Sequence, residues 1–405
     1  MAIVGHQGSG KTSLVEALLY RAGVIDRPGS VDSGTAVCDT GPEARARHQS
    51  IDLAVASFEW NDHRINLLDA PGAQEFLGDA RFALHAADLA LFVIDAADGV
   101  MPHDVTLWRI ARDLGLPRMI FVNKLDRERT SFAATLDQIR ARFGTATDPV
   151  ELPIGEASDF HGVVDLITDK AFLYDTGQAA PADIPGELAD EESARHDELV
   201  EDVVEVDDAA LERYLEGEAP DAATLETLLH RALDETTLFP VLCGSATGPI
   251  GTDRILDLIC RIGPSPVERA ANAEIVTLAA GGAVAPPAAF AQPDPAATTV
   301  VWVFKTRFDD YLGQLSVFKV LSGTLHTDDE LIDARTGDKI RLHQIISLRG
   351  AEHSPVREVV AGDVAAVAKL DTLRTGDTLS PDGGVEVPRP ALSKPVHGIA
   401  VRARA

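Results

Sequence analysis

Eight residues near the start of the chain have the types and spacing of a phosphate-binding loop. Gly5-His-Gln-Gly-Ser-Gly-Lys-Thr12 matches G-x-x-x-x-G-K-[ST], follows an apolar run and precedes a helical pattern at 13–20. Successive backbone N–H groups must wrap a pyrophosphate there, and a Cβ at Gly10 would obstruct them. Lys11 would reach the β and γ phosphates, and Thr12 would bind Mg²⁺. The motif predicts a phosphate site formed by Gly5, His6, Gln7, Gly8, Ser9, Gly10, Lys11, Thr12 and Ser13.

A second motif, Asn123-Lys-Leu-Asp126, can select the base, which a P-loop alone does not do. It follows the apolar run Met119–Val122 and matches N-K-x-D. Asp126 can accept hydrogen bonds from the ring N–H and exocyclic amine of guanine, which adenine does not offer. At roughly 1.5 to 3 kcal/mol for each charged hydrogen bond, ATP should bind several orders of magnitude more weakly than GTP. Lys124 would lie along the purine face, and Asn123 would tie this loop to the P-loop.

Two further motifs complete the set. Asp69-Ala-Pro-Gly72 matches D-x-x-G after an apolar run. Asp69 would hold Mg²⁺ through water, and the Gly72 amide would sense the γ-phosphate and couple hydrolysis to movement of the next segment. Cys243-Gly-Ser-Ala246 can present backbone N–H groups to guanine O6. The predicted GTP-binding residues then also include Asp69, Ala70, Pro71, Gly72, Asn123, Lys124, Asp126, Gly244, Ser245 and Ala246.

These motifs must be positioned by a sheet whose strands all end at one edge. Helical patterns separate most of the apolar runs, as in a parallel sheet covered on both faces. The sequence therefore predicts an α/β P-loop GTPase domain with a mostly parallel sheet and helices on both faces. The expected strands are residues 2–4, 65–68, 89–94, 119–122 and 240–242.

The second half of the chain has a different organisation. Residues 271–298 are dominated by Ala, Gly and Pro, a composition typical of a linker. Beyond them, short alternating strands with frequent turns and no helical segment predict an all-β barrel domain.

The acidic charge is concentrated in one segment. The net charge is −28 from 36 Lys+Arg and 64 Asp+Glu, which excludes a protein that coats nucleic acid by bulk charge. Residues 183–235 hold 19 of the acidic residues and only Arg195, Arg213 and Arg231. Apolar residues recur there at helical intervals, so we expect amphipathic helices with a solvated acidic face. The recurring residues are Leu199, Val203, Val204, Leu211, Tyr214, Leu215, Leu225, Leu228, Leu229 and Leu233.

Composition also bears on location. Apolar residues make up 45% and charged residues 25% of the chain, which argues against wholesale disorder. No apolar stretch approaches 18 residues and the N-terminus lacks a signal-peptide pattern, so a cytoplasmic protein is expected. Cys38, Cys243 and Cys260 are expected to be reduced.

The motifs and several longer segments resemble the translational GTPases of the elongation factor G family, especially its elongation factor G-like branch. Beyond the four motifs, the resemblance includes GTAVCD, Pro42-Glu43 and Arg47–Ile51. It continues through LPIGEASDFHGVVDLITDKAFLY, FPVLCGSATG, VFKTRFDDYLGQLSVFKVLSG and VAGDVAAVAKLDTLRTGDTL. The resemblance implies a GTP-binding (G) domain at 1–262 with an inserted α+β G′ subdomain at 147–236, a linker at 263–297, the family's β-barrel domain II at 298–388, and the start of a truncated third domain at 389–405.

The resemblance further implies GTP/GDP and Mg²⁺ as ligands and the ribosome, with its rRNA and stalk proteins, as partner. No membrane, no DNA and a monomer are expected. Thr12, Ser50 and Asp69 would be the metal residues, with Ser50 at the place of the switch I threonine. Arg45, Arg47 and His48 form a basic strip able to face RNA. Without the domains that move tRNA in elongation factor G, translocation by this chain alone is not expected.

The sequence departs from the family where hydrolysis is carried out. The family has a water-orienting histidine after D-x-P-G, and here that residue is Ala73. Alanine neither donates nor accepts a hydrogen bond, so hydrolysis should be slow or partner-dependent. Gln74, one residue displaced, is a candidate substitute, giving Gly72, Lys11 and Gln74 as catalytic residues. Gly8 replaces an acidic residue common in the family, and His6, His48 and His103 are expected to be surface or packing residues.

Three hypotheses remain open from the sequence. The first is a GTP-hydrolysing switch of the translational family, acting on the ribosome. The second is a non-hydrolysing guanine-nucleotide-binding module with a regulatory role, which Ala73 favours. The third is a P-loop ATPase or kinase with an unrelated barrel, which requires that Asp126 does not select the base.

Overall fold

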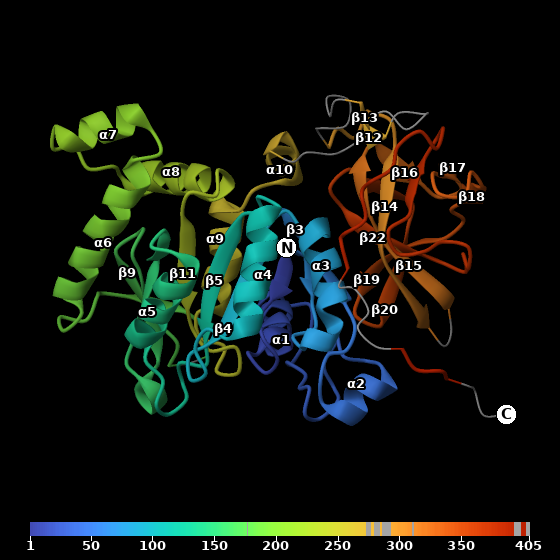
Figure 1. Cartoon of the computed structure of the whole chain (residues 1–405). Coiled ribbons are helices and arrows are strands. Elements are labelled where there is room, and N and C mark those ends of the chain that lie inside the picture. The colour runs from blue at the N-terminus through green and yellow to red at the C-terminus, as the bar shows by residue number, and fades with distance from the viewer. Residues whose placement is uncertain are drawn as a thin grey trace.

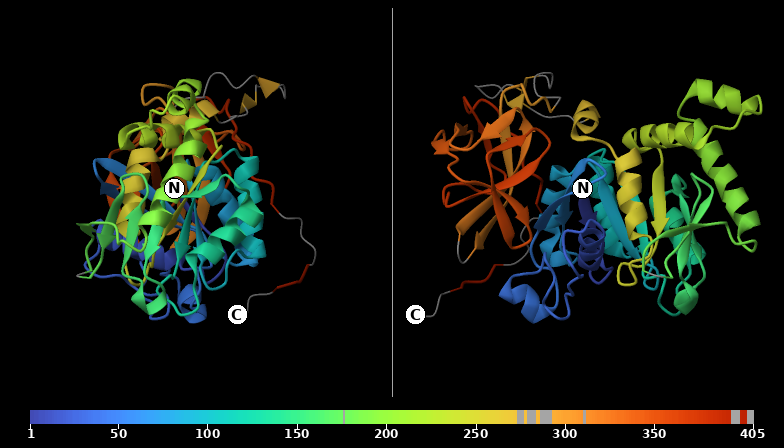
Figure 2. Two further views of the ribbon diagram at one scale, coloured as in Figure 1. Left: turned by 90° about the vertical axis from the view of Figure 1, so that its left-hand side faces the viewer. Right: turned by 180° about the vertical axis from the view of Figure 1, so that it is seen from behind.

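The computed structural model describes residues 1–175, 177–272, 277–278, 284–285, 293–309, 312–392 and 398–401 (Figure 1). An α/β part occupies the middle of the molecule. An acidic lobe lies on one side of it and a β-rich part on the other (Figures 1 and 2). Within these described residues, no helix is both long and apolar enough to cross a bilayer.

The α/β part is built on one twisted sheet in the order β2-β3-β1-β4-β5-β11-β6. Neighbouring strands are parallel except β2 and β3, which form an antiparallel pair. The central strands are buried along their whole length, as expected for near-continuous apolar runs covered on both faces. The strands are β1 (Ala2–Val4), β2 (Ala54–Trp60), β3 (His63–Asp69), β4 (Ala90–Asp95), β5 (Arg118–Asn123), β6 (Thr147–Pro149) and β11 (Phe239–Cys243).

Helices cover this sheet in two groups. One group packs α1 against α9, and the other packs α3, α4 and α5 in succession, so both faces are covered (Figures 1 and 2). The ring of Trp108 on α4 stacks on Phe143 of α5, with 4.2 Å between ring centroids, and both rings pack on Phe92 of β4. The elements are α1 (Lys11–Arg21), α2 (Pro42–Arg47), the 3₁₀ turn η1 (Gln74–Phe76), α3 (Leu77–Ala86), α4 (Pro102–Asp113), α5 (Phe132–Phe143) and α9 (Thr252–Ile262).

The acidic lobe joins a small antiparallel sheet, in the order β10-β9-β8-β7, to three helices. The predicted amphipathic helices are present, and most of the recurring apolar residues are buried. Leu211 and Tyr214 are half-buried, and Leu215, at the end of α7, is 77% exposed. The elements are β7 (Glu151–Ile154), the 3₁₀ turn η2 (Ala157–Asp159), β8 (Gly162–Asp165), β9 (Lys170–Leu173), β10 (Ala180–Ala182), α6 (Ala189–Val204), α7 (Asp208–Leu215) and α8 (Ala222–Asp234).

The C-terminal part is an antiparallel β domain with its own apolar core, which includes Val301, Val303 and Phe318. Its main strands follow the order β18-β17-β23-β14-β15-β22-β19, with β20 on β19 and a separate β16–β21 pair. Together with the α/β part, it confirms the predicted fold class. The strands are β14 (Val300–Asp309), β15 (Gly313–Ser322), β16 (Thr324–His326), β17 (Glu330–Asp333), β18 (Lys339–Arg341), β19 (Ile345–Arg349), β20 (Glu352–Val356), β21 (Glu358–Val360), β22 (Val364–Ala368) and β23 (Thr378–Ser380).

The segment expected to be a linker contains regular structure. It begins with helix α10 (Pro266–Asn272), and β12 (Thr277–Leu278) pairs with β13 (Val284–Ala285). The remainder of the Ala/Gly/Pro stretch, residues 273–276, 279–283 and 286–292, lies outside the described residues. In the segment expected to begin a third domain, residues 393–397 and 402–405 also lie outside them.

The β domain docks on the edge of the α/β sheet next to the Asp69–Gly72 motif. Arg349 of β19 forms a bridge with Ala56 of β2, and the Gly350 N–H donates to the Val55 carbonyl at 2.8 Å. Gly350 has φ +60°, and a Cβ there would run into the Val37 carbonyl, so the close approach requires glycine.

A largely buried lysine crosses the same interface. Lys305 on β14 pairs with Asp79 on α3, with 2.8 Å between Nζ and Oδ2, and also with Asp52. Asp79 also accepts a hydrogen bond from the Leu53 N–H at 3.1 Å. We name Lys305, Asp52 and Asp79 the interdomain clamp, because together they hold β14 to the segment after Ser50 and to α3.

Candidate nucleotide-binding site

The P-loop joins the buried end of β1 to the start of α1. Gly10 is the residue before the helix and has φ +96°, a conformation that favours glycine. From the sequence, glycine is expected at this position because a pyrophosphate must approach the backbone closely. In the structure, the first atom that a Cβ would meet is the side-chain amide of Asn123. Gly10 therefore also makes room for the loop that carries N-K-x-D.

Lys11 is buried and lies back across its own loop. Its Nζ donates to the His6 carbonyl at 2.7 Å. Burial lowers the pKa of Lys11 to about 8, and the nearby carboxylates of Asp69, Asp104 and Asp39 oppose that shift. An ammonium in this place can exchange a backbone carbonyl for a phosphate oxygen without leaving the loop.

His6 packs inside the protein, as expected for a packing residue. Its backbone N–H and Nδ1 contact the Asp104 carboxylate at 2.6 and 3.1 Å, and Asp104 is fully buried at the start of α4. The loop is thereby fixed to α4 before any ligand arrives.

The three predicted metal residues come together. The Thr12 Oγ1 lies 3.0 Å from the Ser50 Oγ and donates to the Asp69 carboxylate at 2.9 Å. Asp69 Oδ1 is buried with no hydrogen-bond partner. Burial, reinforced by Asp39, raises the pKa of Asp69 to about 7. An all-oxygen set with an unsatisfied carboxylate oxygen fits Mg²⁺, which prefers such hard ligands.

Asp39 is a member of this cluster that the sequence analysis did not single out. Its carboxylate accepts from the Ser50 hydroxyl at 2.8 Å and is buried. Burial raises the pKa of Asp39. Asp39 lies in the GTAVCD segment that supported the family resemblance, so the signal was present but had no chemical role attached.

The Asn123 side chain connects three loops. Its Nδ2 donates to the Ser9 carbonyl at 2.8 Å, and its Oδ1 accepts from the N–H groups of Lys124 and Ala246 at 2.8 and 2.9 Å. Lys124, in a left-handed conformation at φ +68°, reaches the Gly8 carbonyl and the Asp95 carboxylate, each at 2.5 Å. The N-K-x-D loop is thus attached to the P-loop through two side chains.

Asp126, the last residue of the N-K-x-D motif, has an unsatisfied acceptor. Its Oδ1 is buried with no hydrogen-bond partner. A buried carboxylate oxygen without a donor is costly, and the N–H groups of a guanine ring are donors of the required type. The group therefore fits the base that the sequence predicts.

The third loop differs from the expectation. The N–H groups of Gly244, Ser245 and Ala246 donate to the carbonyls of Val122 and Ile250 and to the Asn123 side chain, respectively. All three donors are used within the protein, so in this conformation they do not present N–H groups to guanine O6. The loop closes its own turn and is tied to Asn123, so contact with guanine O6 would require these N–H groups to change partners.

A cavity of about 420 Å³ joins these elements, within the size range of small-molecule sites. The predicted residues that line it are Gln7, Gly8, Gly10, Lys11, Thr12, Ser13, Ser50, Gly72, Asn123, Lys124 and Ala246. Those outside the lining are Gly5, His6, Ser9, Asp69, Ala70, Pro71, Gln74, Asp126, Gly244 and Ser245. The lining also includes residues to which the sequence assigned no nucleotide-binding role: Pro28, Gly29, Ser30, Val31, Asp32, His48, Gln49, Arg127 and Thr247. Arg127 and Thr247 directly follow two of the motifs, whereas the others lie outside the four motifs.

The position after Gly72 lacks a group that could orient water. Ala73 is buried. Gln74 is exposed at the start of η1 and does not line the cavity, and its role as a catalytic substitute stays a prediction. The backbone turns away after Ala73, which carries the next side chain out to the surface.

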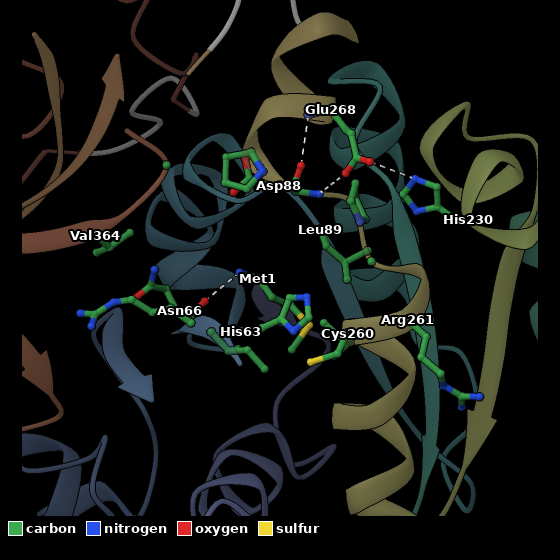
Figure 3. A pocket seen from close by; sticks show the side chains of 18 of the residues that line it. Met1, His63, Asn66, Asp88, Leu89, His230, Cys260, Arg261, Glu268 and Val364 are labelled. Atoms are coloured by element: carbon green, nitrogen blue, oxygen red, sulfur yellow. Dashed lines mark hydrogen bonds and ion pairs between the residues drawn. The ribbon is translucent and has the colours of Figure 1, made fainter. Parts of the chain in front are cut away.

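A second and larger cavity, of about 620 Å³, lies at the other end of the sheet (Figure 3). Its lining includes Met1, Asn66, Cys260, His230 and Glu268. The His230 Nε2 lies 3.2 Å from the Glu268 Oε1. Ligands of open α/β sheets bind at the carboxyl ends of the strands, whereas Met1 precedes β1. The cavity at the P-loop is therefore the candidate nucleotide site.

A mostly parallel sheet, a P-loop after its first strand, a magnesium-type oxygen cluster and an N-K-x-D loop together define the fold and site of a P-loop GTPase. The model of the family described as "Elongation factor Tu GTP binding domain" matches residues 1–265, and "Elongation factor G domain 2" matches residues 298–382. The chain belongs to the elongation factor G family of translational GTPases, and the resemblance drawn from the motifs is confirmed.

Relatives agree over nearly the whole chain. Elongation factor G of Thermotoga maritima is 32% identical over 98% of this chain and 58% of its own length. An elongation factor G-like protein of Synechocystis is 32% identical over 99% of this chain and 57% of its own length. A solved structure from Thermus thermophilus matches with a TM-score of 0.83 and 34% identity, covering 94% of this chain and 53% of that one. The chain therefore spans somewhat more than half the length of the relatives it matches.

Proposed function

We propose that this chain binds GTP and GDP with Mg²⁺ and acts as a nucleotide switch on the ribosome, with slow intrinsic hydrolysis. The observation that carries the proposal is the convergence of Lys11, Thr12, Ser50 and Asn123 around one cavity at the carboxyl edge of the sheet. We propose that three units carry this function: the G domain at 1–262, its G′ insertion at 147–236, and domain II at 298–388.

Each group has a proposed task. The P-loop amides and Lys11 bind the phosphates, and Asp126 accepts the guanine N–H groups. Thr12 and Ser50 are the direct metal ligands, with Asp69 acting through water and Asp39 orienting Ser50. Mg²⁺ in this set supplies charge to the β and γ phosphates.

Slow hydrolysis follows from the region after the D-x-x-G motif. Gly72 lines the cavity beside Lys11, so its amide can contact a γ-phosphate. Ala73 offers no group to hold the attacking water, and positioning of this kind can be worth on the order of 100-fold in rate. The protein would then hold GTP until a partner completes the site.

Base selection is tested by displacing a fluorescent GDP analogue. GTP and GDP should compete at similar concentrations, whereas ATP should require a concentration several orders of magnitude higher. Comparable affinity for ATP would show that Asp126 does not select the base and would favour the ATPase or kinase hypothesis.

Hydrolysis is tested by single-turnover GTP cleavage with and without ribosomes. Wild type should cleave slowly alone, Gln74→Ala should be unchanged, and Ala73→His should be faster with ribosomes by on the order of 100-fold. Fast cleavage by wild type alone would contradict the proposal. No cleavage even with ribosomes would favour the non-hydrolysing regulatory module, which Ala73 supports as the second candidate.

The ribosomal partner is tested by co-sedimentation with a GTP analogue or GDP. Arg45, Arg47 and His48 on and after α2 are exposed and offer a basic strip to rRNA. The chain should pellet with ribosomes preferentially in the GTP-analogue state, and Arg45→Ala with Arg47→Ala should weaken this binding. Arg213→Ala, exposed in the acidic lobe, is the matched control. We propose that the protein is a monomer and acts in the cytoplasm.

A further inference from the structure

A group of three metal-ligating side chains lies in the acidic lobe, on the part of the molecule that carries α6 and β9 (Figure 1). Glu192 and His196 lie one helical turn apart on α6, and Asp169 lies in the turn before β9. One ligand atom from each residue lies within 4.8 Å of the other two. Residues i and i+4 share a helix face, which explains how Glu192 and His196 reach the same turn.

Glu192 is more than nine-tenths buried, at 8% exposed. Its Oε1 is enclosed and has no hydrogen-bond partner. Burial and the facing Asp169 carboxylate raise the pKa of Glu192. A buried acceptor that is left without a donor or a cation is costly.

The two carboxylates lack the usual counter-charge. Among the described residues, neither Asp169 nor Glu192 forms an ion pair with a lysine or arginine. Asp169 contacts His196, with 3.1 Å between Oδ1 and Nδ1, and it also shares a side-chain hydrogen bond with Glu192. The surrounding segment, residues 183–235, contains 19 acidic residues and three arginines, so its field attracts cations.

The histidine is held in place by the turn that it faces. Its Nδ1 lies 2.8 Å from the Leu166 carbonyl. The same Nδ1 lies 3.1 Å from the Asp169 Oδ1, so it is the ring atom that faces the carboxylates, and a cation bound through it would take the place of the contact with the Leu166 carbonyl.

We propose that Asp169, Glu192 and His196 form a binding site for a first-row transition dication, with Zn²⁺ as the best fit. One imidazole and two carboxylates match the nitrogen and oxygen donors of zinc better than the all-oxygen sets of Mg²⁺ or Ca²⁺. Zinc bonds of 2.0–2.2 Å place neighbouring ligand atoms about 3.3 Å apart. The Nδ1 of His196 and the Oδ1 of Asp169 are already 3.1 Å apart, and all three ligand atoms lie within 4.8 Å of one another, so the groups need to close by no more than about 1.5 Å. The Asp169 side chain is 58% exposed and can make that movement. The ion would fasten the turn before β9 to α6.

The proposal is specific to this cluster. His6, Asp95 and Asp98 form a second group of similar spacing near the P-loop. In that group, the Asp95 carboxylate already pairs with the Lys124 ammonium at 2.5 Å, so its negative charge is balanced without a metal ion.

The test is titration of the full chain with ZnCl₂ by calorimetry, with GDP and Mg²⁺ saturating the nucleotide site. All proteins carry Cys260→Ser, which removes the half-exposed thiol and leaves the two buried cysteines. Wild type should bind one Zn²⁺ that Glu192→Gln, His196→Gln and Asp169→Asn each weaken by at least about tenfold, as even outer contacts of metal sites do when lost. Glu191→Gln, a neighbouring exposed carboxylate on α6, is the matched control and should bind as wild type does.

Two further measurements make the outcome decisive. Saturating Zn²⁺ should raise the melting temperature of wild type and of Glu191→Gln but not that of His196→Gln. Co²⁺ should give visible absorption bands in wild type that His196→Gln loses. Asp169→Asn changes an exposed turn residue, so it keeps the test valid if a variant on α6 does not fold. The proposal is overturned if wild type binds no Zn²⁺, or if the ligand variants bind it as tightly as the control. The cluster would then be a proton-sharing ion-pair group.

Discussion

Removal of the lysine in the interdomain clamp should destabilise the protein far more than removal of an exposed lysine. Lys305 is 12% exposed and faces the carboxylates of Asp79, 24% exposed, and Asp52, 45% exposed. Lys305→Met keeps most of the apolar stem but leaves two carboxylates facing each other. Breaking a buried pair by removing one partner costs about 3 to 5 kcal/mol. Since Asp52 is nearly half exposed and remains hydrated, we expect a loss of about 2 to 3 kcal/mol in the free energy of unfolding.

The assay is urea unfolding followed by tryptophan fluorescence. Lys339→Met is the matched control, because Lys339 is 69% exposed and pairs with Glu330 at 2.7 Å within one hairpin. It should leave the free energy of unfolding nearly unchanged. Adding Asp79→Asn to Lys305→Met should recover part of the loss, since the repulsion from Asp52 is then removed.

The result that refutes this reasoning is equal destabilisation by Lys305→Met and Lys339→Met. A double variant less stable than Lys305→Met alone would also refute it, because the cost would then come from lost packing. Since Asp52 lies two residues after Ser50 and Asp79 is on α3, Lys305→Met should also change the rate of nucleotide release, whereas Lys339→Met should not.

Three further predictions concern single groups. Asp126→Asn should weaken GTP binding by about 3 to 6 kcal/mol and favour xanthine nucleotides, which present an acceptor where guanine has its amine; nucleotide competition measures both. Ser50→Ala removes a hydroxyl beside Thr12, so the Mg²⁺ concentration that half-saturates nucleotide binding should rise; an unchanged Mg²⁺ requirement would exclude Ser50 as a ligand. Burial raises the pKa of Glu151 to about 8, and its carboxylate accepts from the Cys243 N–H. Its proton is held more tightly in the folded state, so its contribution to stability is full below the unfolded pKa and is lost as pH rises through 8. Glu151→Gln should lack this loss and become more stable than wild type above pH 8 in pH-dependent urea unfolding; parallel curves for the two proteins would contradict the assignment.

The strands and the order of the motifs could be predicted from the sequence. Ala2–Val4, Ala90–Asp95 and Phe239–Cys243 are apolar and buried on both faces, so their pattern alone marks them as central strands. The helical spacing of apolar residues in the acidic segment likewise predicts its helices. Such patterns are local, because burial on one or both faces is imposed residue by residue along the element.

Contacts between loops could not be predicted in the same way. Gln74 is next to the expected catalytic position in sequence, yet the backbone turn at Ala73 places it on the surface. Asp39 carries no motif of its own, yet it contacts Ser50. The amides of Gly244, Ser245 and Ala246 have the right place along the chain, yet other oxygens of the protein already accept from them. Each of these three results depends on which side chains and backbone groups come into contact in the folded protein. The spacing of residues along the sequence does not specify those contacts.

By itself, the sequence determined the fold class and the family, and it predicted the chemistry of the candidate nucleotide site, because these depend on residue types at fixed positions after buried strands. Only the tertiary structure decided that Lys124 reaches Asp95, that Lys305 joins domain II to Asp52 and Asp79, and that Asp169 meets Glu192 and His196. The physical reason is that the energies of charges and hydrogen bonds fall steeply with distance and exposure. Those distances are fixed by packing between segments that are far apart in the chain.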